Sequence, residues 1–205
     1  MNLTGTHVEL QPLRVDHVEG LLAAATEDRS NYQWTWVPGD RDTMRRYVEV
    51  ALAELDRGAS IPYATIRRSD GKPCGSTRFM NLERWPNPFL PPPPKTAPPD
   101  ALEIGTTWLS ASAQRTVVNT EAKLLMLGHA FEVMKVKRVT LKTDERNVRS
   151  RRAIERLGAK LDGVLRAWQR GVDGNPRNTA TYSILAAEWP TLSLSLRERV
   201  ARGAG

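Results

Sequence analysis

Cysteine, clustered histidine and long apolar runs are all scarce in this sequence. Its 205 residues include one cysteine, Cys74, so no internal disulfide can form, which fits a reducing compartment. The three histidines, His7, His17 and His129, show no metal-ligand spacing, and we expect no bound metal. No apolar run reaches the roughly 18 residues of a membrane span, and the first residues lack the apolar core of a signal peptide. These absences predict a cytoplasmic protein that does not enter the membrane.

The composition is that of an ordinary folded protein with an excess of positive charge. Hydrophobic residues make up 40% and charged residues 26% of the chain, as in soluble globular domains. We expect a single domain over residues 1–190, followed by a helical tail over 191–205 that frays at its end. The net charge of +7 favours an anionic partner, either a phosphorylated cofactor or nucleic acid. Much of the excess positive charge lies in the run ERNVRSRRAIERLGAK. The alternative to an anion-binding role for this run is a solvated helix face.

Glycine is absent from the stretch SAQRTVVNTEA, residues 112–122, which lies between a strand-like segment and an apolar helix. Many α/β proteins place a glycine-rich, anion-binding turn at such a junction. The first N–H groups of a helix have no partner inside the helix, and the helix dipole is positive there. The junction is therefore suited to bind an anion, and two interpretations stay open, a phosphate-binding turn that is built without glycine and an ordinary loop between strand and helix.

Hydrophobic periodicity predicts a mixture of strands and helices. Their order is a strand, two helices, three strands, a helix, a strand, a helix and two strands. This order lacks a regular strand–helix–strand alternation, which argues against a Rossmann fold and predicts an α+β fold with helices on the faces of one mixed sheet. Strands are expected at residues 6–14, 61–68, 73–82, 102–109, 138–142, 160–171 and 178–185, and helices at 16–25, 42–57, 121–134 and 147–157.

A proline-rich stretch interrupts this pattern at residues 85–100. Seven of the 14 prolines lie between Pro88 and Pro99. Prolines at this density prevent helix formation and strand pairing, and they favour an extended chain. Because the strands on either side continue one pattern, we expect an inserted loop rather than a linker between domains.

Four segments carry a resemblance that covers nearly the whole chain. They are EIGTTWL, QRTVVNTEAKLLMLGHAFE, RVTLKTDERNVRSRRAIERLGAKLDGVLR and TATYSILAAEWP, in this order. In order and spacing they resemble the GNAT superfamily of acyl-CoA-dependent N-acetyltransferases, and more narrowly its RimJ/RimL-like branch. The resemblance implies a mixed, mostly antiparallel sheet of about seven strands flanked by helices. It also implies direct transfer of an acetyl group from acetyl-CoA to a primary amine, either a protein N-terminus or a small molecule, with no covalent enzyme intermediate.

The resemblance assigns the cofactor to the strand at 102–109 and to the turn that follows it. In the superfamily this strand splays from its neighbour, its backbone pairs with the pantetheine arm, and a turn of the form Gln/Arg-x-x-Gly-x-Gly/Ala wraps the pyrophosphate. Here the turn starts at Gln114 and has Val117 and Asn119 at its small-residue positions. Val117 is a departure, because its branched side chain disfavours positive φ and stands where backbone should approach phosphate. The residues implied to bind the cofactor are Trp108, Leu109, Gln114, Arg115, Thr116, Val117, Val118, Asn119, Thr120, Asn147 and Ser150.

Polar side chains in the turn offer a replacement for glycine. Arg115, Asn119 and Thr120 supply charge and hydrogen bonds to phosphate that glycine-based turns do not need. The alternative is a turn that no longer binds phosphate, in a fold that has lost its cofactor.

Two side chains are candidates for the chemistry. Glu103 is the candidate base that takes the proton of the amine, directly or through water, and the alternative is a surface glutamate. The resemblance implies that Ser150 protonates the departing thiolate and that Asn147 binds the pantetheine arm, although both residues also suit the cap of a helix. A backbone N–H near Trp108 or Leu109 is expected to stabilise the oxyanion.

Aromatic residues indicate where the acceptor binds. Trp34 and Trp36 lie between the first two predicted helices, a segment that lines the acceptor pocket in the superfamily, and they suit an amine with an apolar body. Trp85 and the proline-rich loop are expected to add a second wall. Tryptophan is also a common core residue, so a purely structural role is the alternative.

Two other functions stay open, a CoA-binding sensor without catalysis and a basic module that binds RNA or the ribosome. Binding to RNA would place aromatic residues among the basic ones. The arginine-rich run contains none, which counts against nucleic acid. The expected partners are therefore acetyl-CoA and an amine acceptor, and a homodimer stays open.

Overall fold

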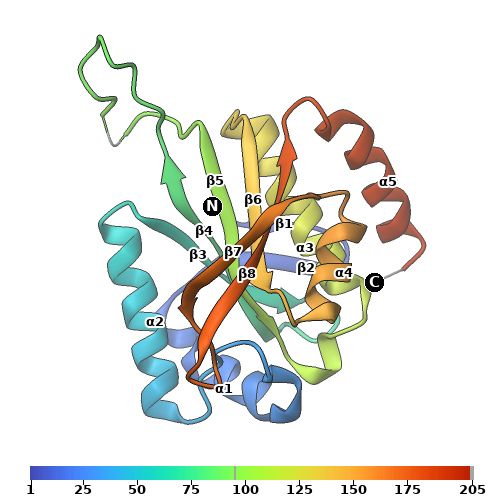
Figure 1. The fold of residues 1–205 in the computed structure, drawn as a ribbon. Helices are drawn as coiled ribbons and strands as arrows, with labels where there is room; N and C mark the ends of the chain where they lie inside the picture. Colours follow the sequence, from blue (N-terminus) through green and yellow to red (C-terminus); the bar gives the residue numbers. More distant parts are fainter. Residues whose placement is uncertain (95, 204–205) are drawn as a thin grey trace.

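One mixed sheet of eight strands forms the centre of the protein (Figure 1). The computed structural model describes residues 1–94 and 96–203. The strands are β1 Leu3–Thr4, β2 Val8–Pro12, β3 Ser60–Arg67, β4 Lys72–Glu83, β5 Ala101–Leu109, β6 Arg138–Asp144, β7 Lys160–Arg170 and β8 Pro176–Leu185. Their order across these described residues is β1-β2-β3-β4-β5-β6-β8-β7, and β5 and β6 are the one parallel pair. The predicted mixed, mostly antiparallel sheet is confirmed, and the strand beyond the seven expected is the two-residue β1.

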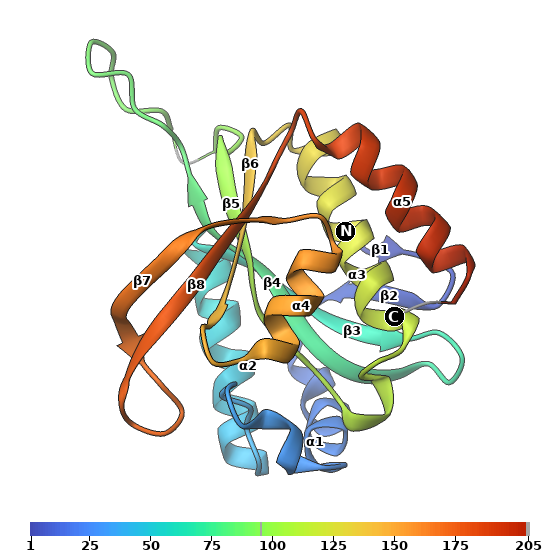
Figure 2. The same ribbon diagram turned by 45° about the vertical axis from the view of Figure 1, so that its right-hand side comes forward.

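Helices cover both faces of the sheet (Figures 1 and 2). They are α1 Val18–Thr26, α2 Arg41–Asp56, α3 Val117–Gly128, α4 Val148–Arg156 and α5 Trp189–Ala201. One core cluster joins the sheet to α1 and α2, and a second joins it to α3, α4 and α5. Strand β5 contributes to both, because Trp108 belongs to the first cluster and Leu102 and Ile104 to the second. None of the described helices combines the length and apolar character needed to cross a membrane.

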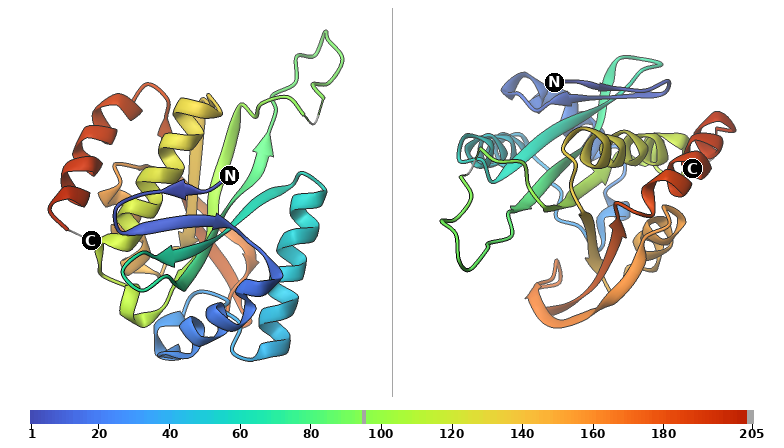
Figure 3. Two further views of the ribbon diagram at one scale, coloured as in Figure 1. Left: turned by 180° about the vertical axis from the view of Figure 1, so that it is seen from behind. Right: turned by 90° about the horizontal axis from the view of Figure 1, so that it is seen from above.

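Helix α3 buries a carboxylate that the apolar pattern of its sequence does not predict. The Glu121 side chain accepts hydrogen bonds from the backbone N–H groups of Thr6, His7 and Val8, at 2.8, 2.6 and 2.7 Å. Three N–H donors satisfy the charge of a buried carboxylate as an ion pair would. They also hold the β1–β2 hairpin against α3, where Figure 3 shows the two elements side by side.

Lys123 is buried between α3 and the sheet. Its Nζ atom lies 2.6 Å from Oγ1 of Thr107 on β5 and 3.2 Å from Oγ1 of Thr77 on β4. Both partners are neutral hydroxyls, so nothing in contact with the amine offsets the loss of water around its charge. Burial accordingly lowers the pKa of Lys123 to about 7.

The proline-rich segment between β4 and β5 projects away from the rest of the protein (Figures 1 and 3). Its base is closed by a hydrogen bond from the Trp85 backbone N–H to Asp100 Oδ2, at 2.8 Å. The Lys137 ammonium pairs with Asp100 and lies 5.4 Å from the centre of the Trp85 ring. Residue 95 of the predicted loop, like residues 204–205 of the predicted tail, lies outside the described residues.

The parallel ladder between β5 and β6 is short. It has three pairs, Ala101 with Arg138, Leu102 with Val139 and Glu103 with Thr140. Beyond these pairs the two strands diverge, and β6 continues to pair with β8 alone (Figure 2). Residues 104–109 of β5 are thus left without a strand partner on the side of β6. We call the space between these residues and residues 141–144 of β6 the wedge.

Candidate functional site

The wedge presents an unpaired strand edge in the middle of the sheet. Backbone N–H and C=O groups are rarely left without partners inside a protein, so the edge at residues 104–109 is suited to bind an extended ligand that carries amides. A bulge distorts the same stretch, because Thr106 has a φ of 49° and the register against β4 shifts there. The bulge turns the last residues of β5 relative to its first residues.

The turn after β5 takes its left-handed conformation at Arg115 and not at Val117. Arg115 has a φ of 59°, a region that favours glycine. Val117 is the first residue of α3 and is buried at the start of the helix. The expected conflict between Val117 and a positive φ does not arise, because the helix begins earlier than predicted and places Val117 in ordinary helical conformation.

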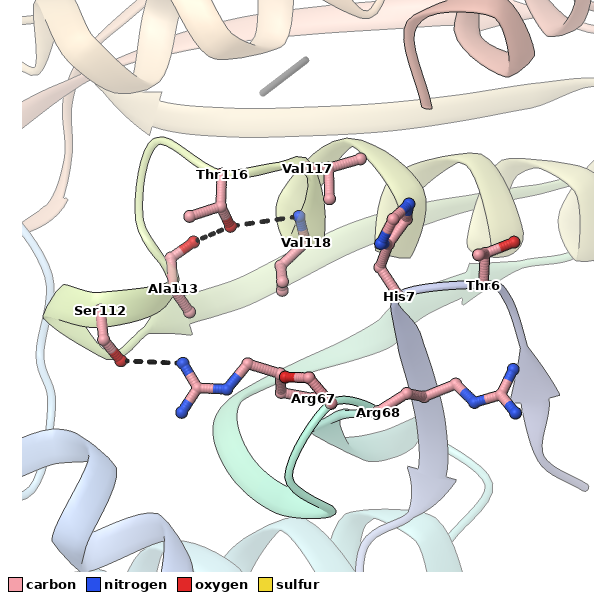
Figure 4. A pocket seen from close by; sticks show the side chains of 10 residues that line it. Thr6, His7, Arg67, Arg68, Ser112, Ala113, Thr116, Val117 and Val118 are labelled. Atoms are coloured by element: carbon pink, nitrogen blue, oxygen red, sulfur yellow. Dashed lines mark hydrogen bonds between the residues drawn. The ribbon is translucent and has the colours of Figure 1, made fainter. Parts of the chain in front are cut away.

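Thr116 caps α3 and shapes the turn (Figure 4). Its Oγ1 accepts a hydrogen bond from the Val118 N–H at 3.3 Å and donates one to the Ala113 carbonyl at 2.7 Å. The remaining N–H groups of the first turn, including that of Asn119, have no intrahelical acceptor. They face the end of the helix where its dipole is positive, so an anion is stabilised there.

Two side chains fix the end of β5 through one carbonyl. The Leu109 oxygen accepts hydrogen bonds from Gln114 Nε2 at 2.9 Å and from the Tyr32 hydroxyl at 3.0 Å. Gln114 therefore holds the turn with its side chain. Trp108 is buried beside Tyr32 with ring centres 6.2 Å apart, so it contributes only backbone to the wedge.

Asn147 and Ser150 lie on the other side of the wedge, at the start of α4. Asn147 Oδ1 accepts a hydrogen bond from the Ser150 N–H at 3.0 Å, so Asn147 has the capping role that was the alternative for it. The Asn147 Nδ2 group remains available, since the cap uses only the oxygen. The Ser150 hydroxyl has no hydrogen bond to another part of the chain that the structure describes.

The arginines of the basic run mostly bind other parts of the protein. Arg146 forms a bidentate pair with Asp144, at 3.0 and 2.8 Å, and stacks on Trp34 with 4.3 Å between guanidinium carbon and ring centre. Arg149 donates to Asn31, with 2.7 Å to its carbonyl oxygen and 3.2 Å to Oδ1. These contacts tie the start of α4 to the segment between α1 and α2, a role that the sequence did not predict.

Glu103 occupies the apex of the wedge. It is the β5 residue of the last ladder pair, and it is 8% exposed. Its Oε2 lies 2.9 Å from the Lys142 Nζ and 2.9 Å from the Asn81 Nδ2. The alternative of a surface glutamate is therefore wrong, and Lys142 is a site residue that the sequence analysis missed. The sequence could not predict this ion pair, because the register between the two strands that carry Glu103 and Lys142 was unknown.

The tryptophans expected around the acceptor do not all come together. Trp34 lies on Arg146 near the wedge, and Trp36 is 62% exposed on the same segment. Trp85 belongs to the base of the proline-rich loop, at the opposite end of β5 from the turn. In its place the structure brings Trp168 of β7 to the site, with its ring centre 5.4 Å from the Lys142 Nζ.

A model of the acetyltransferase (GNAT) domain matches residues 7–160 of the chain. The chain belongs to the GNAT family of acetyltransferases. Among solved structures, a putative acetyltransferase from T. thermophilus is 32% identical over 97% of this chain and 96% of that one, with a TM-score of 0.78. A GCN5-related N-acetyltransferase from Brucella melitensis is 25% identical over 98% of this chain and 85% of that one, with a TM-score of 0.83.

The resemblance to the RimJ/RimL-like branch of the GNAT family is confirmed at the level of the fold. Mycobacterium smegmatis RimJ in complex with CoA-disulfide superposes with a TM-score of 0.76, over 96% of this chain and 90% of that one, at 20% identity. No curated protein sequence matches the chain significantly.

The GNAT family uses acetyl-CoA, and the wedge of this chain fits that molecule. The strand edge at 104–109 matches the amides of a pantetheine arm, and the start of α3 matches a pyrophosphate. The turn at 114–120 contains no acidic residue, and the nearby Glu121 carboxylate is bound by the β1–β2 hairpin. The first turn of α3 therefore keeps its positive potential for a phosphorylated ligand.

Proposed function

We propose that this GNAT protein acetylates a primary amine by direct attack of the amine on acetyl-CoA, without a covalent enzyme intermediate. The acceptor is a protein N-terminus or a small-molecule amine. The position of Glu103 carries the proposal. A buried carboxylate at the last ladder pair stands where the strands begin to diverge, so its oxygen lies beside the narrow end of the wedge.

Acetyl-CoA, when bound, supplies the activated acetyl group as a thioester. The unpaired edge of β5 and the Asn147 Nδ2 group would hold the pantetheine arm. The turn at 114–120 would bind the pyrophosphate through the N–H groups at the start of α3, with the exposed Arg115 side chain adding charge. A backbone N–H near Trp108 or Leu109 would donate to the acetyl carbonyl oxygen as negative charge develops there.

Glu103 takes the proton of the amine in this proposal. Lys142 and Asn81 orient its carboxylate from one side, since both contact Oε2, and Oε1 is left for the proton or for a bridging water. Ser150 Oγ would supply a proton to the departing sulfur, because its hydroxyl is not engaged with the described parts of the chain.

Mass spectrometry tests this function. Peptides with free N-termini and a set of small primary amines are incubated with acetyl-CoA and either the wild-type protein or its Glu103→Gln variant. The proposal predicts amines that gain one acetyl group with the wild type and much more slowly with the variant. Acetyl-CoA binding without acetylation of any amine would favour a sensor, and the enzyme proposal would then be dropped.

Binding to RNA is less well supported than acetyl transfer. Arg146, Arg149 and Arg151 all make intramolecular hydrogen bonds, which leaves fewer free cations in the basic run than the sequence suggested. The Trp34 ring stacks on Arg146 of the basic run, so that face of the ring is not available to stack on a nucleic-acid base.

A further inference from the structure

A bulge shapes the edge of β5 that lines the wedge. The ladder pairs on either side of it are Arg78 with Gly105 and Ser76 with Trp108. Two residues of β5, Thr106 and Thr107, therefore stand opposite one residue of β4, Thr77. A bulge disrupts the backbone ladder locally, so the shape of the strand at this place depends on the side chains that surround it.

Lys123 reaches the bulge from α3. Its Nζ atom lies 2.6 Å from Thr107 Oγ1 and 3.2 Å from Thr77 Oγ1, and the two hydroxyl oxygens lie 2.8 Å apart. We call these three side chains the bulge cluster. Lys123 and Thr77 are buried, whereas Thr107 is half-buried on the edge that lines the wedge. Thr107 is therefore the member through which Lys123 can act on that edge.

The amine of Lys123 is not needed to satisfy its neighbours. The two threonine hydroxyls are close enough to bond to each other, and a buried ammonium without a carboxylate is costly. A methionine of similar length would fill the same space without that cost. An amine at this place therefore calls for an explanation, and its contact with both strands of the bulge supplies one.

No charged side chain among the described residues offsets the charge of Lys123. Arg78 of β4 and Glu103 of β5 lie on the opposite face of the sheet, where each forms an ion pair. Glu121 of α3 is bound by the N-terminal hairpin. Burial is accordingly the one cause that lowers the pKa of Lys123 to about 7. The amine thus gains or loses its charge close to neutral pH.

The charge state of Lys123 changes what the amine needs. The ammonium has three N–H donors and no acceptor, and the cluster offers it two hydroxyl oxygens. The third donor and the charge call for water, and Thr107, the half-buried member, is the side chain whose displacement admits it. The neutral amine donates to one hydroxyl and accepts from the other, so the dry cluster satisfies it.

We propose that Lys123 is a positioning residue for acetyl-CoA, which fixes the bulge of β5 when its amine is neutral and loosens the bulge when the amine is protonated. Lys123 acts through Thr107 and touches neither the cofactor nor the acceptor. The inference rests on the proposed binding of acetyl-CoA along the edge at residues 104–109. Affinity for the cofactor then rises as Lys123 loses its proton, because an edge that is already ordered loses less entropy on binding.

An NMR titration of the protein without ligand tests the bulge directly. Backbone amide shifts of Thr106, Thr107 and Trp108 are followed from about pH 5.5 to 8.5, a range that spans the titration of Lys123. The variants are Lys123→Met and Lys72→Met, an exposed control at the start of β4. The wild type and the control should share a midpoint of about pH 7 that Lys123→Met lacks. Melting temperatures show whether each variant folds.

Calorimetric titration with dephospho-CoA tests the link to the cofactor. This probe lacks the 3′-phosphate, whose own titration at about pH 6 would interfere. From pH 6 to pH 8 its dissociation constant should fall roughly threefold to tenfold in the wild type, below the limit of about tenfold per pH unit that one proton sets. It should change less than about twofold in Lys123→Met. Thr107→Val keeps the amine but removes its contact with the edge, so its affinity should likewise not follow pH.

Two outcomes overturn this inference alone. They are amides of the bulge that titrate alike in the wild type and Lys123→Met, and binding whose pH dependence in Thr107→Val equals that of the wild type. Binding without acetylation of any amine overturns the proposed function and leaves the inference intact. No binding of dephospho-CoA at millimolar concentration contradicts the cofactor site and overturns both.

Discussion

Glu103 Oε2 lies 2.9 Å from the Nζ atom of Lys142, which follows the last ladder residue of β6 by two positions. The ion pair therefore bridges the two strands at the point where they begin to diverge. It holds a carboxylate at the narrow end of the wedge, and the strands beyond it are free to take a ligand between them.

Glu103→Gln should lower kcat by roughly a hundredfold or more, because an amide cannot take the proton of the amine. The affinity for acetyl-CoA should stay within about twofold, since Glu103 is placed toward the acceptor. Initial rates and calorimetric titration of acetyl-CoA measure the two effects. Glu83→Gln, at the exposed end of β4, is the control and should have normal activity. Full activity in Glu103→Gln across the pH range would remove the assignment of Glu103 as the base.

Arg115→Gly separates the backbone of the turn from the side chain. The left-handed φ of 59° is strained for arginine and free of strain for glycine, so this variant should unfold at the same or a higher temperature. Arg115→Ala keeps the strain and loses the same side chain. Both variants should bind CoA roughly tenfold more weakly by calorimetry if the guanidinium contacts phosphate. Unchanged affinity in both would mean that the turn binds phosphate by its backbone alone.

Lys123→Met should change how stability depends on pH. The wild-type amine has a pKa of about 7 when folded, against an ordinary value of 10.5. The unfolded chain therefore binds more protons between these pH values, and wild-type stability rises with pH across this window by about 1.4 kcal/mol per unit. The variant lacks this slope. Urea denaturation at pH 7, 8 and 9 measures the difference, with the exposed Lys72→Met as control. Parallel profiles for wild type and Lys123→Met would contradict the lowered pKa.

Glu121→Gln should loosen the N-terminal hairpin. The amide replaces a charged acceptor by a neutral one and directs its own NH₂ group at backbone donors. A loss of about 2–4 kcal/mol in the free energy of unfolding is expected. Hydrogen exchange at Thr6, His7 and Val8 should speed up before the rest of the sheet does. Exposed Glu198→Gln is the control, and equal protection in both variants would mean that other contacts hold the hairpin.

Trp34→Leu tests which tryptophan serves the acceptor. Loss of the ring stacked on Arg146 should raise the acceptor KM roughly fivefold and leave the affinity for acetyl-CoA unchanged. Trp85→Leu is the matched comparison, because Trp85 lies at the opposite end of β5. A larger effect in Trp85→Leu would place the acceptor beside the proline-rich loop and contradict the assignment of Trp34.

Periodicity and turn residues were enough to predict the order of the elements, and the resemblance to the GNAT superfamily implied which strand opens into the wedge. They could not show where the turn would take its left-handed residue. That choice depends on α3 starting at Val117, which in turn depends on the cap from Thr116 and on the core beneath it. The alternation of β5 correctly put Glu103 opposite to Leu102 and Ile104. Whether the Glu103 side chain faces solvent or the wedge depends on its contact with Lys142. That contact depends on the register between β5 and β6, which no local sequence pattern encodes.

Other site residues were missed because their partners are distant in sequence. Trp168 is an ordinary strand residue in the sequence, and it reaches Lys142 only because β8 pairs with β6 and places the β7–β8 hairpin beside it. The buried pair of Glu121 and its N–H donors spans more than a hundred residues and uses backbone groups, which leave no trace in side-chain patterns. The arginines of the basic run looked like a surface charge cluster, and only the folded chain shows Arg149 reaching Asn31 and Arg146 reaching Trp34.

In the proposed function, the hydrogen bonds between Arg149 and Asn31 have a thermodynamic consequence for the binding of the amine and of acetyl-CoA. They fasten the segment that leads to Trp34 onto the start of α4, which carries Asn147, so a displacement of either part strains the other. Reciprocity then requires that the amine and acetyl-CoA alter one another's affinity by the same factor. Arg149→Ala removes these hydrogen bonds and should bring that factor toward one, so that the amine and acetyl-CoA bind independently.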